Sequence, residues 1–385
     1  MSIDIDVKFN QQSEIWLNSL KTRKRRPVSP ATLRAFNSYV RRLTPILGDF
    51  KLAEINNGTL KQLVQRLDNE RLSPKTIAEL VSTVKQVVAS LVDENTGEPL
   101  FRREWSARFI DCPTITNQKQ YCATREDVER CIKEAATDQE KVLYAILAGS
   151  GLRIAEALAI HVNGRDDQTS WNLERGAIDV RSSIFSAHEI PRLKTLAARR
   201  TADLDPPLSD LIATFVEING IQPGDYLFQA RSGRAMHLKT ARERLAKHEI
   251  PGFHAFRRYR ITRLRELGCP EDIIKFWVGH AGRQSDITGQ WEPETITDRY
   301  SKLSQNRDLR AAWAKRAGLG FVLPELHNAE EPAPHVDSTA KAESHAPPRA
   351  ESIVEVVPEA MPYEASDDDL PVELFETAVE QVEQA

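Results

Sequence analysis

The composition of the chain changes near residue 320, and this change limits how much of it can fold around a core. Residues 1–320 carry 50 Lys and Arg against 40 Asp and Glu, whereas residues 321–385 carry 2 against 16. Eight of the 21 prolines fall after Leu323. An acidic, proline-rich segment buries too little apolar surface to offset the entropy of ordering it. We therefore expect folded domains up to residue 320 and an acidic, disordered tail over residues 321–385.

The net charge of the whole chain hides this contrast. The formal value of −4 combines +10 over residues 1–320 with −14 over residues 321–385. At 385 residues, the chain is long enough for two or more domains, each with its own core. A basic folded part fits a polyanionic partner such as nucleic acid.

Other features bear on where the protein works. No apolar run approaches the ~18–20 residues of a membrane span, and the N-terminus lacks the basic and then apolar pattern of a secretory signal. The four cysteines are few and widely spaced, which favours a reducing compartment and gives neither a disulfide framework nor zinc-ligand spacing. We expect a cytoplasmic protein without a membrane partner.

Amphipathic helices dominate residues 1–115. Two Ser-Pro pairs, at residues 29–30 and 73–74, each mark a helix start, because a serine can cap exposed amides and a proline in the first turn loses no hydrogen bond. Apolar residues follow both pairs at helical spacing, and shorter helices are expected over residues 11–20 and 57–67. We predict a small domain of four helices.

Five positive charges stand within six residues near the first of these helices. They are Lys21, Arg23, Lys24, Arg25 and Arg26. Such a run is either a solvated loop or a segment that contacts the phosphates of a nucleic acid. We favour phosphate contact, because the run belongs to a small helical domain at the start of a basic chain.

Residues 116–320 indicate a second domain of mixed structure. An extended linker is expected over residues 111–120. Residues 177–185 alternate like a β-strand, and residues 199–204 are expected to pair with them. Helical patterns return over residues 207–317. The expected fold is therefore mainly α with a small β-sheet.

Two short motifs in this second domain each contain an arginine. Arg153 lies in the segment AGSGLRIAEALAI (residues 148–160), in which the glycines bring the backbone close to a ligand and the arginine enters the first turn of a helix. Glu156 shares the helix face of Arg153 and can hold its guanidinium in place. His254 and Arg257 are also three residues apart, so on a helix both can reach one phosphate. Taken alone, the motifs also fit a surface ion pair and a solvated basic helix.

Three further polar residues stand in local patterns of their own. Lys194 is the only lysine between residues 176 and 208 and lies in an expected hairpin. His280 follows Gly279 at the end of an apolar run, where a neutral imidazole can donate to a phosphate oxygen or satisfy a helix end. Tyr300 lies in the segment TDRYSKL.

These residue types match the requirements of metal-free attack on a phosphodiester. Fixed cations must counter the charge of the phosphate oxygens, and the planar fork of arginine does this best. The leaving 5′ oxygen needs a proton donor, and a tyrosine hydroxyl ionises more easily beside a cationic cluster. A tyrosine ester also conserves the bond energy, so that religation needs no ATP.

A metal-dependent reaction is the alternative chemistry. It would need His, Cys and carboxylate ligands at short spacing. His254 and His280 come without such companions. We expect neither a metal nor another cofactor.

The order of these motifs resembles the tyrosine recombinase (phage integrase) family over residues 10–318. The resemblance implies a two-domain DNA clamp, with an N-terminal four-helix core-binding domain (residues 1–115) and an α+β integrase-type catalytic domain (residues 116–320) around double-stranded DNA. It implies a site-specific recombinase that integrates or excises a mobile element at the nucleoid. Four protomers would assemble on two duplexes, each with a helix over residues 309–317 packed on a neighbour, and an accessory DNA-bending protein fits this scheme.

The resemblance also implies a role for each catalytic candidate. Tyr300 would attack the scissile phosphate, leaving a 3′-phosphotyrosine, and Lys194 would protonate the leaving 5′ oxygen. His254 would act as an acid, a base or a hydrogen-bond donor, and His280 as a donor. The arginines of the two motifs, Arg153 and Arg257, would neutralise the charge that develops on the phosphate.

The spacing before Tyr300 departs from the family pattern. The family usually places its tyrosine much closer to the histidine that precedes it, whereas here the two residues are at positions 280 and 300. The insert over residues 283–294 is expected to loop outward. If it displaces Tyr300, the protein is a DNA-binding module with lost or altered catalysis. A type IB topoisomerase-like relaxer with the same chemistry is the second alternative.

Overall fold

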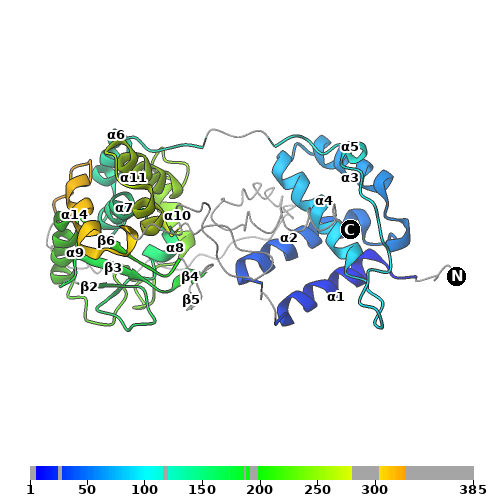
Figure 1. The fold of residues 1–385 in the computed structure, drawn as a ribbon, viewed down its shortest axis with the longest axis horizontal. Coiled ribbons are helices and arrows are strands. Elements are labelled where there is room, and N and C mark those ends of the chain that lie inside the picture. Colours follow the sequence, from blue (N-terminus) through cyan, green and yellow to red (C-terminus); the bar gives the residue numbers. More distant parts are fainter. Residues whose placement is uncertain are drawn as a thin grey trace, which may run out of the picture. The chain divides into compact units, whose positions relative to one another are not determined.

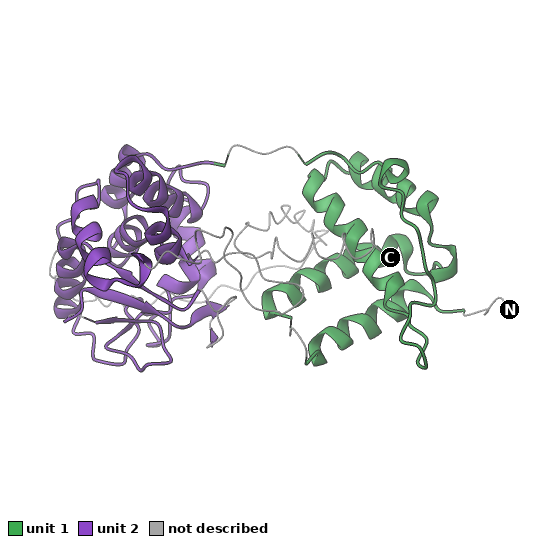
Figure 2. Ribbon diagram, in the orientation of Figure 1, with its two compact units in different colours: residues 1–120, 369–385 green, residues 121–368 purple. Residues whose placement is uncertain are grey.

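The computed structural model describes residues 6–24, 28–115, 120–172, 174–185, 188–190, 198–279 and 303–326. These residues form two compact units with separate cores, unit 1 up to Gln120 and unit 2 from Tyr121 onwards (Figure 2). Helices prevail and a small sheet lies in unit 2, so the predicted fold class is confirmed. None of the helices in the described ranges is both long and apolar enough to cross a membrane.

Unit 1 is built from helices (Figure 1). Their apolar faces pack together. Both predicted Ser-Pro starts are confirmed, because Ser29 Oγ accepts the N–H of Thr32 at 3.1 Å and Ser73 Oγ accepts that of Thr76 at 3.2 Å. The elements are α1 (Phe9–Thr22), α2 (Pro30–Leu47), the 3-10 turn η1 (Leu52–Glu54), α3 (Asn57–Asn69), α4 (Pro74–Ala89) and α5 (Ala107–Ile110).

Unit 2 combines helices with short strands (Figure 1). Its helices are α6 (Arg125–Glu134), α7 (Asp138–Ser150), α8 (Ile154–Ala157), α9 (Pro206–Ile218), α10 (Leu238–Leu245), α11 (His254–Glu266), α12 (Glu271–Val278), the 3-10 turn η3 (Leu303–Gln305) and α14 (Arg307–Ala317). Its strands are β1 (His161–Val162), β2 (Ser170–Asn172), β3 (Ala177–Val180), β4 (Ser183–Phe185), β5 (His188–Ile190) and β6 (Arg200–Asp203).

Helix α7 forms the centre of unit 2. Residues 142–150 of this helix are all buried, and α6, α9 and α11 pack around it. Tyr144 stacks on Phe256 of α11 with ring centroids 5.7 Å apart. A helix that is apolar on all sides belongs in a core. Its end is set by Gly151, whose φ of +70° turns the chain out of the core toward Arg153.

The main sheet has the strand order β1-β2-β3-β6. β1 and β2 are parallel, and the other neighbouring pairs are antiparallel. β3 pairs with β6 in a register that places Val180 opposite Arg200 and Ala177 opposite Asp203. The predicted pairing of these two segments is therefore confirmed.

The strand expected over residues 177–185 is interrupted in its middle. β3 ends at Val180, and β4 pairs with β5 in a separate two-stranded sheet. The hydroxyl of Thr169 accepts the N–H groups of Arg181 and Ser182, both at 2.9 Å, and donates to the carbonyl of Ser182 at 2.8 Å. Because a side chain occupies these backbone groups, the ladder cannot continue through them.

Helix α14 confirms the helix expected over residues 309–317, and it packs on its own unit. Ala314 and Ala317 are buried in an apolar cluster with Ile273 and Trp277 of α12. Arg310 adds a buried ion pair, with Nε 2.7 Å from Asp203 Oδ2 at the end of β6. These residues of the helix are thus covered within its own unit, and packing on a neighbouring protomer stays a prediction.

Candidate catalytic site

Separate segments of unit 2 meet at Arg257 on α11. The residue is only 1% exposed. Its Nη1 donates to the carbonyl of Gly151 at 2.9 Å, and its Nη2 donates to the carbonyl of Val278. Gly151 lies two residues before Arg153, and Val278 lies two residues before His280. One guanidinium therefore joins the backbones of all three motifs, although Gly151 and Arg257 are 106 residues apart in sequence.

Arg153 stands just before α8 and is held by Glu156, as predicted. The guanidinium Nη1 lies 3.0 Å from Glu156 Oε1, and the side chain remains 31% exposed. The prediction that Arg153 enters the first turn of a helix is wrong by one position, because its backbone is extended and caps α8. The backbone N–H of Arg153 also donates to Glu156 Oε2 at 2.9 Å. The same carboxylate thus fixes both ends of this arginine.

Arg200 on β6 belongs to the same cluster, and the sequence reasoning did not select it. Its guanidinium is fully buried and contacts both oxygens of Glu156, at 2.7 and 3.1 Å. Its Nε donates to the carbonyl of Trp277 at 2.6 Å. The signal was present in the strand pattern, since Arg200 alternates with Ala202 on the face that is buried.

The cluster carries an excess of positive charge. Arg153 and Arg200 share the single carboxylate of Glu156, which leaves this group of three side chains with a net charge of +1. Burial favours the neutral form of Glu156, but Arg200 and Arg153 outweigh it and hold the pKa of that carboxyl well below its usual range. An excess cation that is only partly exposed favours an anionic ligand beside Arg153.

His254 is the first residue of α11, one turn before Arg257. The predicted arrangement on one helix is therefore confirmed, and the imidazole is half-buried. The N-terminus of this helix is the positive end of the helix dipole, which favours an anion nearby.

Gly279 closes α12 against this cluster. Its φ is +63°, in the left-handed region that favours glycine. A Cβ atom at this position would lie 3.0 Å from Nη1 of Arg200. A glycine therefore allows the chain to leave α12 toward His280 while Arg200 stays bonded to the carbonyl of Trp277.

Several predicted site residues lie outside the described residues. They are the catalytic candidates Lys194, His280 and Tyr300, and the basic-run residues Arg25 and Arg26. The structure does describe the chain close to each catalytic candidate, at Ile190, Ala198, Gly279 and Leu303.

The described part of the basic run belongs to the end of α1. Lys21 lies in the last turn of this helix, rather than in a loop, and Arg23 and Lys24 follow it. All three side chains are exposed, and none of them pairs with a carboxylate among the residues that the structure describes. Lys21 Nζ donates to Asn18 Oδ1 at 3.1 Å. These charges are thus available to a phosphate.

Four of the five tyrosine hydroxyls in the described ranges donate to a protein oxygen, and the hydroxyl of Tyr144 is buried. Tyr121 donates to Asp127 at 2.5 Å, and Tyr259 donates to the carbonyl of Leu319 at 3.2 Å. Their pKa values are raised, which is the opposite of what a nucleophile needs. Burial raises the pKa of Tyr39, Tyr144, Tyr226 and Tyr259, and the hydrogen bond to Asp127 raises that of Tyr121 to about 12.

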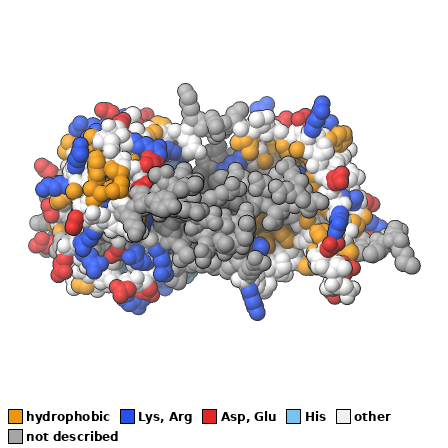
Figure 3. All heavy atoms as spheres, viewed as in Figure 1, with side chains coloured by type: hydrophobic (Ala, Val, Ile, Leu, Met, Phe, Trp, Pro, Cys, Tyr) orange, Lys and Arg blue, Asp and Glu red, His pale blue; other side chains and the backbone are white. Residues whose placement is uncertain are grey.

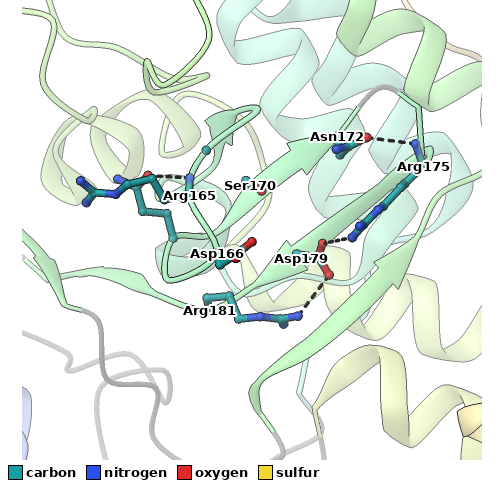
Figure 4. Close-up of a pocket in the computed structure, with 9 residues that line it drawn as sticks. Arg165, Asp166, Ser170, Asn172, Arg175, Asp179 and Arg181 are labelled. Atoms are coloured by element: carbon teal, nitrogen blue, oxygen red, sulfur yellow. Dashed lines mark hydrogen bonds and ion pairs between the residues drawn. The ribbon is translucent and has the colours of Figure 1, made fainter.

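A shallow polar pocket lies beside strands β2 and β3 (Figure 4). Its lining includes Arg165, Arg175 and Arg181, and none of the predicted catalytic residues. Arg175 and Arg181 both pair with Asp179, at 3.4 and 3.3 Å. As at Glu156, two arginines share one carboxylate here, so the net charge of these pairs does not distinguish the pocket from the cluster at Arg153.

Charged side chains of both signs lie on the drawn face of each unit. On the face drawn in Figure 3, Lys and Arg side chains alternate with Asp and Glu on unit 1 and on unit 2. Among the side chains that this view draws in colour, the basic residues are not gathered into a single patch. Where an anion binds therefore depends on the contacts of individual Lys and Arg side chains.

No protein-family model matches the chain, and no curated protein sequence matches it. Solved structures do resemble it. The integrase of transposon Tn1549 in complex with transposon right end DNA aligns with a TM-score of 0.55 and 17% identity, over 76% of this chain and 98% of that chain. XerH site-specific recombinase bound to palindromic difH substrate aligns with a TM-score of 0.50 and 13% identity, over 72% of this chain and 92% of that chain. The chain thus has the two-domain fold of tyrosine recombinase structures.

Proposed function

We propose that the protein is a site-specific DNA recombinase, an enzyme that cuts and rejoins DNA strands through a 3′-phosphotyrosine intermediate. The observation that carries this proposal is the position of Arg257, whose guanidinium bonds to the carbonyls of Gly151 and Val278. It gathers Arg153, His254 and the chain that leads to His280 around one point. The shared fold supports the proposal, since the Tn1549 integrase and XerH structures both contain DNA.

In the proposed reaction, the Tyr300 oxygen bonds to the scissile phosphorus as the bond to the 5′ oxygen breaks. Lys194 gives a proton to the leaving 5′ oxygen. His254 acts beside the phosphate as acid, base or donor, and as the base it takes the proton that the Tyr300 hydroxyl loses. Arg153 and Arg257 stabilise the charge that develops on the phosphate oxygens, an effect worth several kcal/mol in a preorganised site. The 5′-hydroxyl of a second duplex then attacks the phosphotyrosine and restores the DNA backbone.

The pKa values and hydrogen bonds of the other tyrosines support Tyr300 as the nucleophile. The five tyrosines in the described ranges have raised pKa values, and four of their hydroxyls donate to protein oxygens. Tyr300 follows the third motif, whereas Tyr363 lies in the acidic segment. Elimination and motif order therefore agree on the same residue.

The protein–DNA adduct is the direct test. The target must first be mapped from the junctions that the protein forms in cells, and a nicked duplex of that sequence then traps the intermediate. We expect wild-type protein to form a covalent adduct that resists denaturation, and Tyr300→Phe to form none. An intact adduct with Tyr300→Phe would refute the assignment of the nucleophile.

Tyr259→Phe is the matched control for this experiment. Its hydroxyl donates to the carbonyl of Leu319, so its loss should cost about 1 kcal/mol of stability and leave the adduct intact. If Tyr259→Phe abolished the adduct while Tyr300→Phe retained it, Tyr259 would be the nucleophile instead. If wild-type protein formed no junctions in cells and no adduct on nicked DNA that it binds, the DNA-binding module would be the correct function.

The reaction product separates a recombinase from a relaxing enzyme. A type IB topoisomerase-like protein religates the strand that it cut, whereas a recombinase joins strands from two duplexes. We expect recombinant junctions when two mapped sites are supplied. Relaxed plasmid without recombinant product would favour the topoisomerase.

The proposal includes how the protein engages DNA. Residues 1–115 would form the core-binding domain and residues 116–320 the catalytic domain, with Lys21, Arg23 and Lys24 on phosphates and Arg25 and Arg26 in the same run. Four protomers would hold two duplexes, and a DNA-bending protein would assist if the mapped sites are widely spaced. Sedimentation on mapped DNA would measure the number of protomers.

A further inference from the structure

A second buried polar cluster lies outside the arginine site, around Glu189 in the middle of β5. Three donors from different parts of unit 2 converge on its carboxylate. Ser182 Oγ donates to Oε1 at 2.5 Å, Tyr226 Oη donates to Oε2 at 3.0 Å, and Nε2 of His161 lies 3.1 Å from Oε2. The side chain of His161 is 4% exposed and that of Glu189 is 18% exposed. Such convergence holds the strand at one place in the unit.

The contacts of His161 favour a charged imidazole. Nδ1 lies 2.8 Å from the carbonyl of Gly224, and Nε2 lies 3.1 Å from Glu189 Oε2. The carbonyl oxygen is an acceptor, and so is Glu189 as a carboxylate, so both ring nitrogens carry a proton when Glu189 is ionised. His161 and Glu189 therefore form a buried ion pair between β1 and β5. The ring of Tyr226 packs against the imidazole, with centroids 4.0 Å apart.

Strand β5 depends on these contacts for its position. β4 and β5 are three residues each and form a sheet of their own, apart from the main sheet. An isolated pair of short strands is marginal in water and needs packing or anchoring to persist. The Glu189 cluster supplies this anchoring from the core side.

Chain order connects this cluster to the proposed reaction. Ile190 ends β5, and Lys194 follows four residues later. Four residues span at most about 14 Å, so the position of β5 limits where the lysine can act. On the other side, β6 is fixed by the bonds of Arg200 to Glu156.

We propose that His161 and Glu189 are positioning residues for the leaving-group proton transfer, because their buried ion pair fixes the strand that leads to Lys194. This inference rests on the proposed function, in which Lys194 is the acid. The pair touches neither the phosphate nor Lys194 in our scheme and acts through the backbone of β5.

The ionisation behaviour of the pair agrees with the geometry. Burial works against the charged imidazole, but the hydrogen bonds of Glu189 and the Gly224 carbonyl outweigh it and raise the pKa of His161. Burial likewise favours the neutral form of Glu189, but the bonds of His161 and Ser182 outweigh it and lower the pKa of that carboxyl. Arg165 is the other charged group that acts on His161, and it opposes the rise.

A DNA substrate with sulfur in place of the leaving 5′ oxygen provides the test. In this substrate the P–S bond breaks and a thiolate leaves, which needs no proton because the pKa of a thiol is only about 8.5. We expect His161→Gln to slow adduct formation about tenfold on nicked mapped DNA with the ordinary oxygen, as for partial loss of a general acid. On the sulfur substrate its rate should lie within about twofold of wild type.

The chain offers a matched control on the same strand. His188 is exposed on β5, where no side-chain contact is described for it, so His188→Gln should leave both rates unchanged. Tyr226→Phe removes only one donor from Glu189 and should show the same substrate dependence with a smaller loss. If circular dichroism shows that His161→Gln does not fold, Tyr226→Phe replaces it in the test. Equal losses on the two substrates, or no loss on either, would overturn the positioning role.

Lys194→Ala separates this inference from the proposed function. If its defect is not rescued by sulfur, Lys194 is not the acid and the proposed role of this lysine fails. If Lys194→Ala is rescued while the His161→Gln and Tyr226→Phe defects are not, the positioning role alone is wrong. The expected result is rescue in all three variants, with no rescue in Arg257→Gln.

Discussion

At the scale of single residues, the candidate site depends on a small number of buried charged side chains. Glu156 is 3% exposed and contacts Arg153 and Arg200 at once. A buried charge that loses its partner is costly, because the remaining ion keeps its desolvation penalty. Arg200 therefore supports the site even though it lies behind Arg153, and its loss should act first on stability.

Arg200→Gln should destabilise unit 2 by about 3–5 kcal/mol, because it leaves Glu156 with one arginine in place of two. Arg199→Gln is the matched control on the adjacent, exposed position and should change stability by less than about 0.5 kcal/mol. Urea unfolding followed by circular dichroism measures both. Equal effects of the two substitutions would contradict the role assigned to Arg200.

The stability contribution of Glu156 should depend on pH. Its pKa is lowered in the folded protein, so the contribution is full above the unfolded value of about 4.3 and is lost as the pH falls through the lowered value. Glu156→Gln should therefore be clearly less stable than wild type at pH 7, and the gap should narrow below about pH 4. Urea titrations at several pH values would check this, and a gap that stays constant in acid would count against it.

At the scale of elements, helix ends place the site. Gly151 caps the end of α7, His254 begins α11, and Gly279 caps the end of α12, so three helix termini lie around Arg257. Free carbonyl groups at the ends of α7 and α12 accept the bonds of this guanidinium. A change in the backbone path of these turns would therefore move the carbonyl groups that hold Arg257.

Gly279→Ala should be more harmful than Gly268→Ala. Both glycines have positive φ values, +63° and +73°, so either alanine carries a backbone cost of about 1 kcal/mol. Only at Gly279 would the new Cβ also meet Arg200, at 3.0 Å, whereas Gly268 has open space around it. We expect an added loss of about 1–2 kcal/mol at Gly279 and a fall in adduct yield. Thermal unfolding and the adduct assay measure the difference, and indistinguishable variants would refute the contact.

At the scale of the whole molecule, two units with separate cores carry separate parts of the proposed function. Unit 1 presents the exposed cations of the basic run, and unit 2 holds the buried arginine cluster. Removing the cations that bind phosphates should weaken DNA binding and its salt dependence, whereas disrupting the cluster should block chemistry. The two effects are therefore separable by experiment.

Replacing Lys21, Arg23 and Lys24 by Gln should lower the slope of log K against log salt by about 0.9 for each phosphate that the protein no longer neutralises. Binding should weaken on all DNA sequences alike, because phosphate contacts carry no base information. Arg42→Gln with Arg66→Gln is the control, since both arginines lie within ion-pair distance of Glu70. Fluorescence anisotropy at several salt concentrations would compare them, and an unchanged slope in the triple variant would rule out phosphate contact.

The sequence alone determined the helical character of unit 1, the Ser-Pro helix starts and the motifs of Arg153 and Arg257. These features depend on local periodicity, capping and residue type, which can be read within a few positions. It did not reveal the break after Val180, which a side chain 11 residues earlier imposes, or the role of Arg200, which pairs with Glu156 across 44 residues. Only the tertiary structure decided which carbonyls hold Arg257 and how three donors meet at Glu189, because such contacts join segments that no local pattern relates.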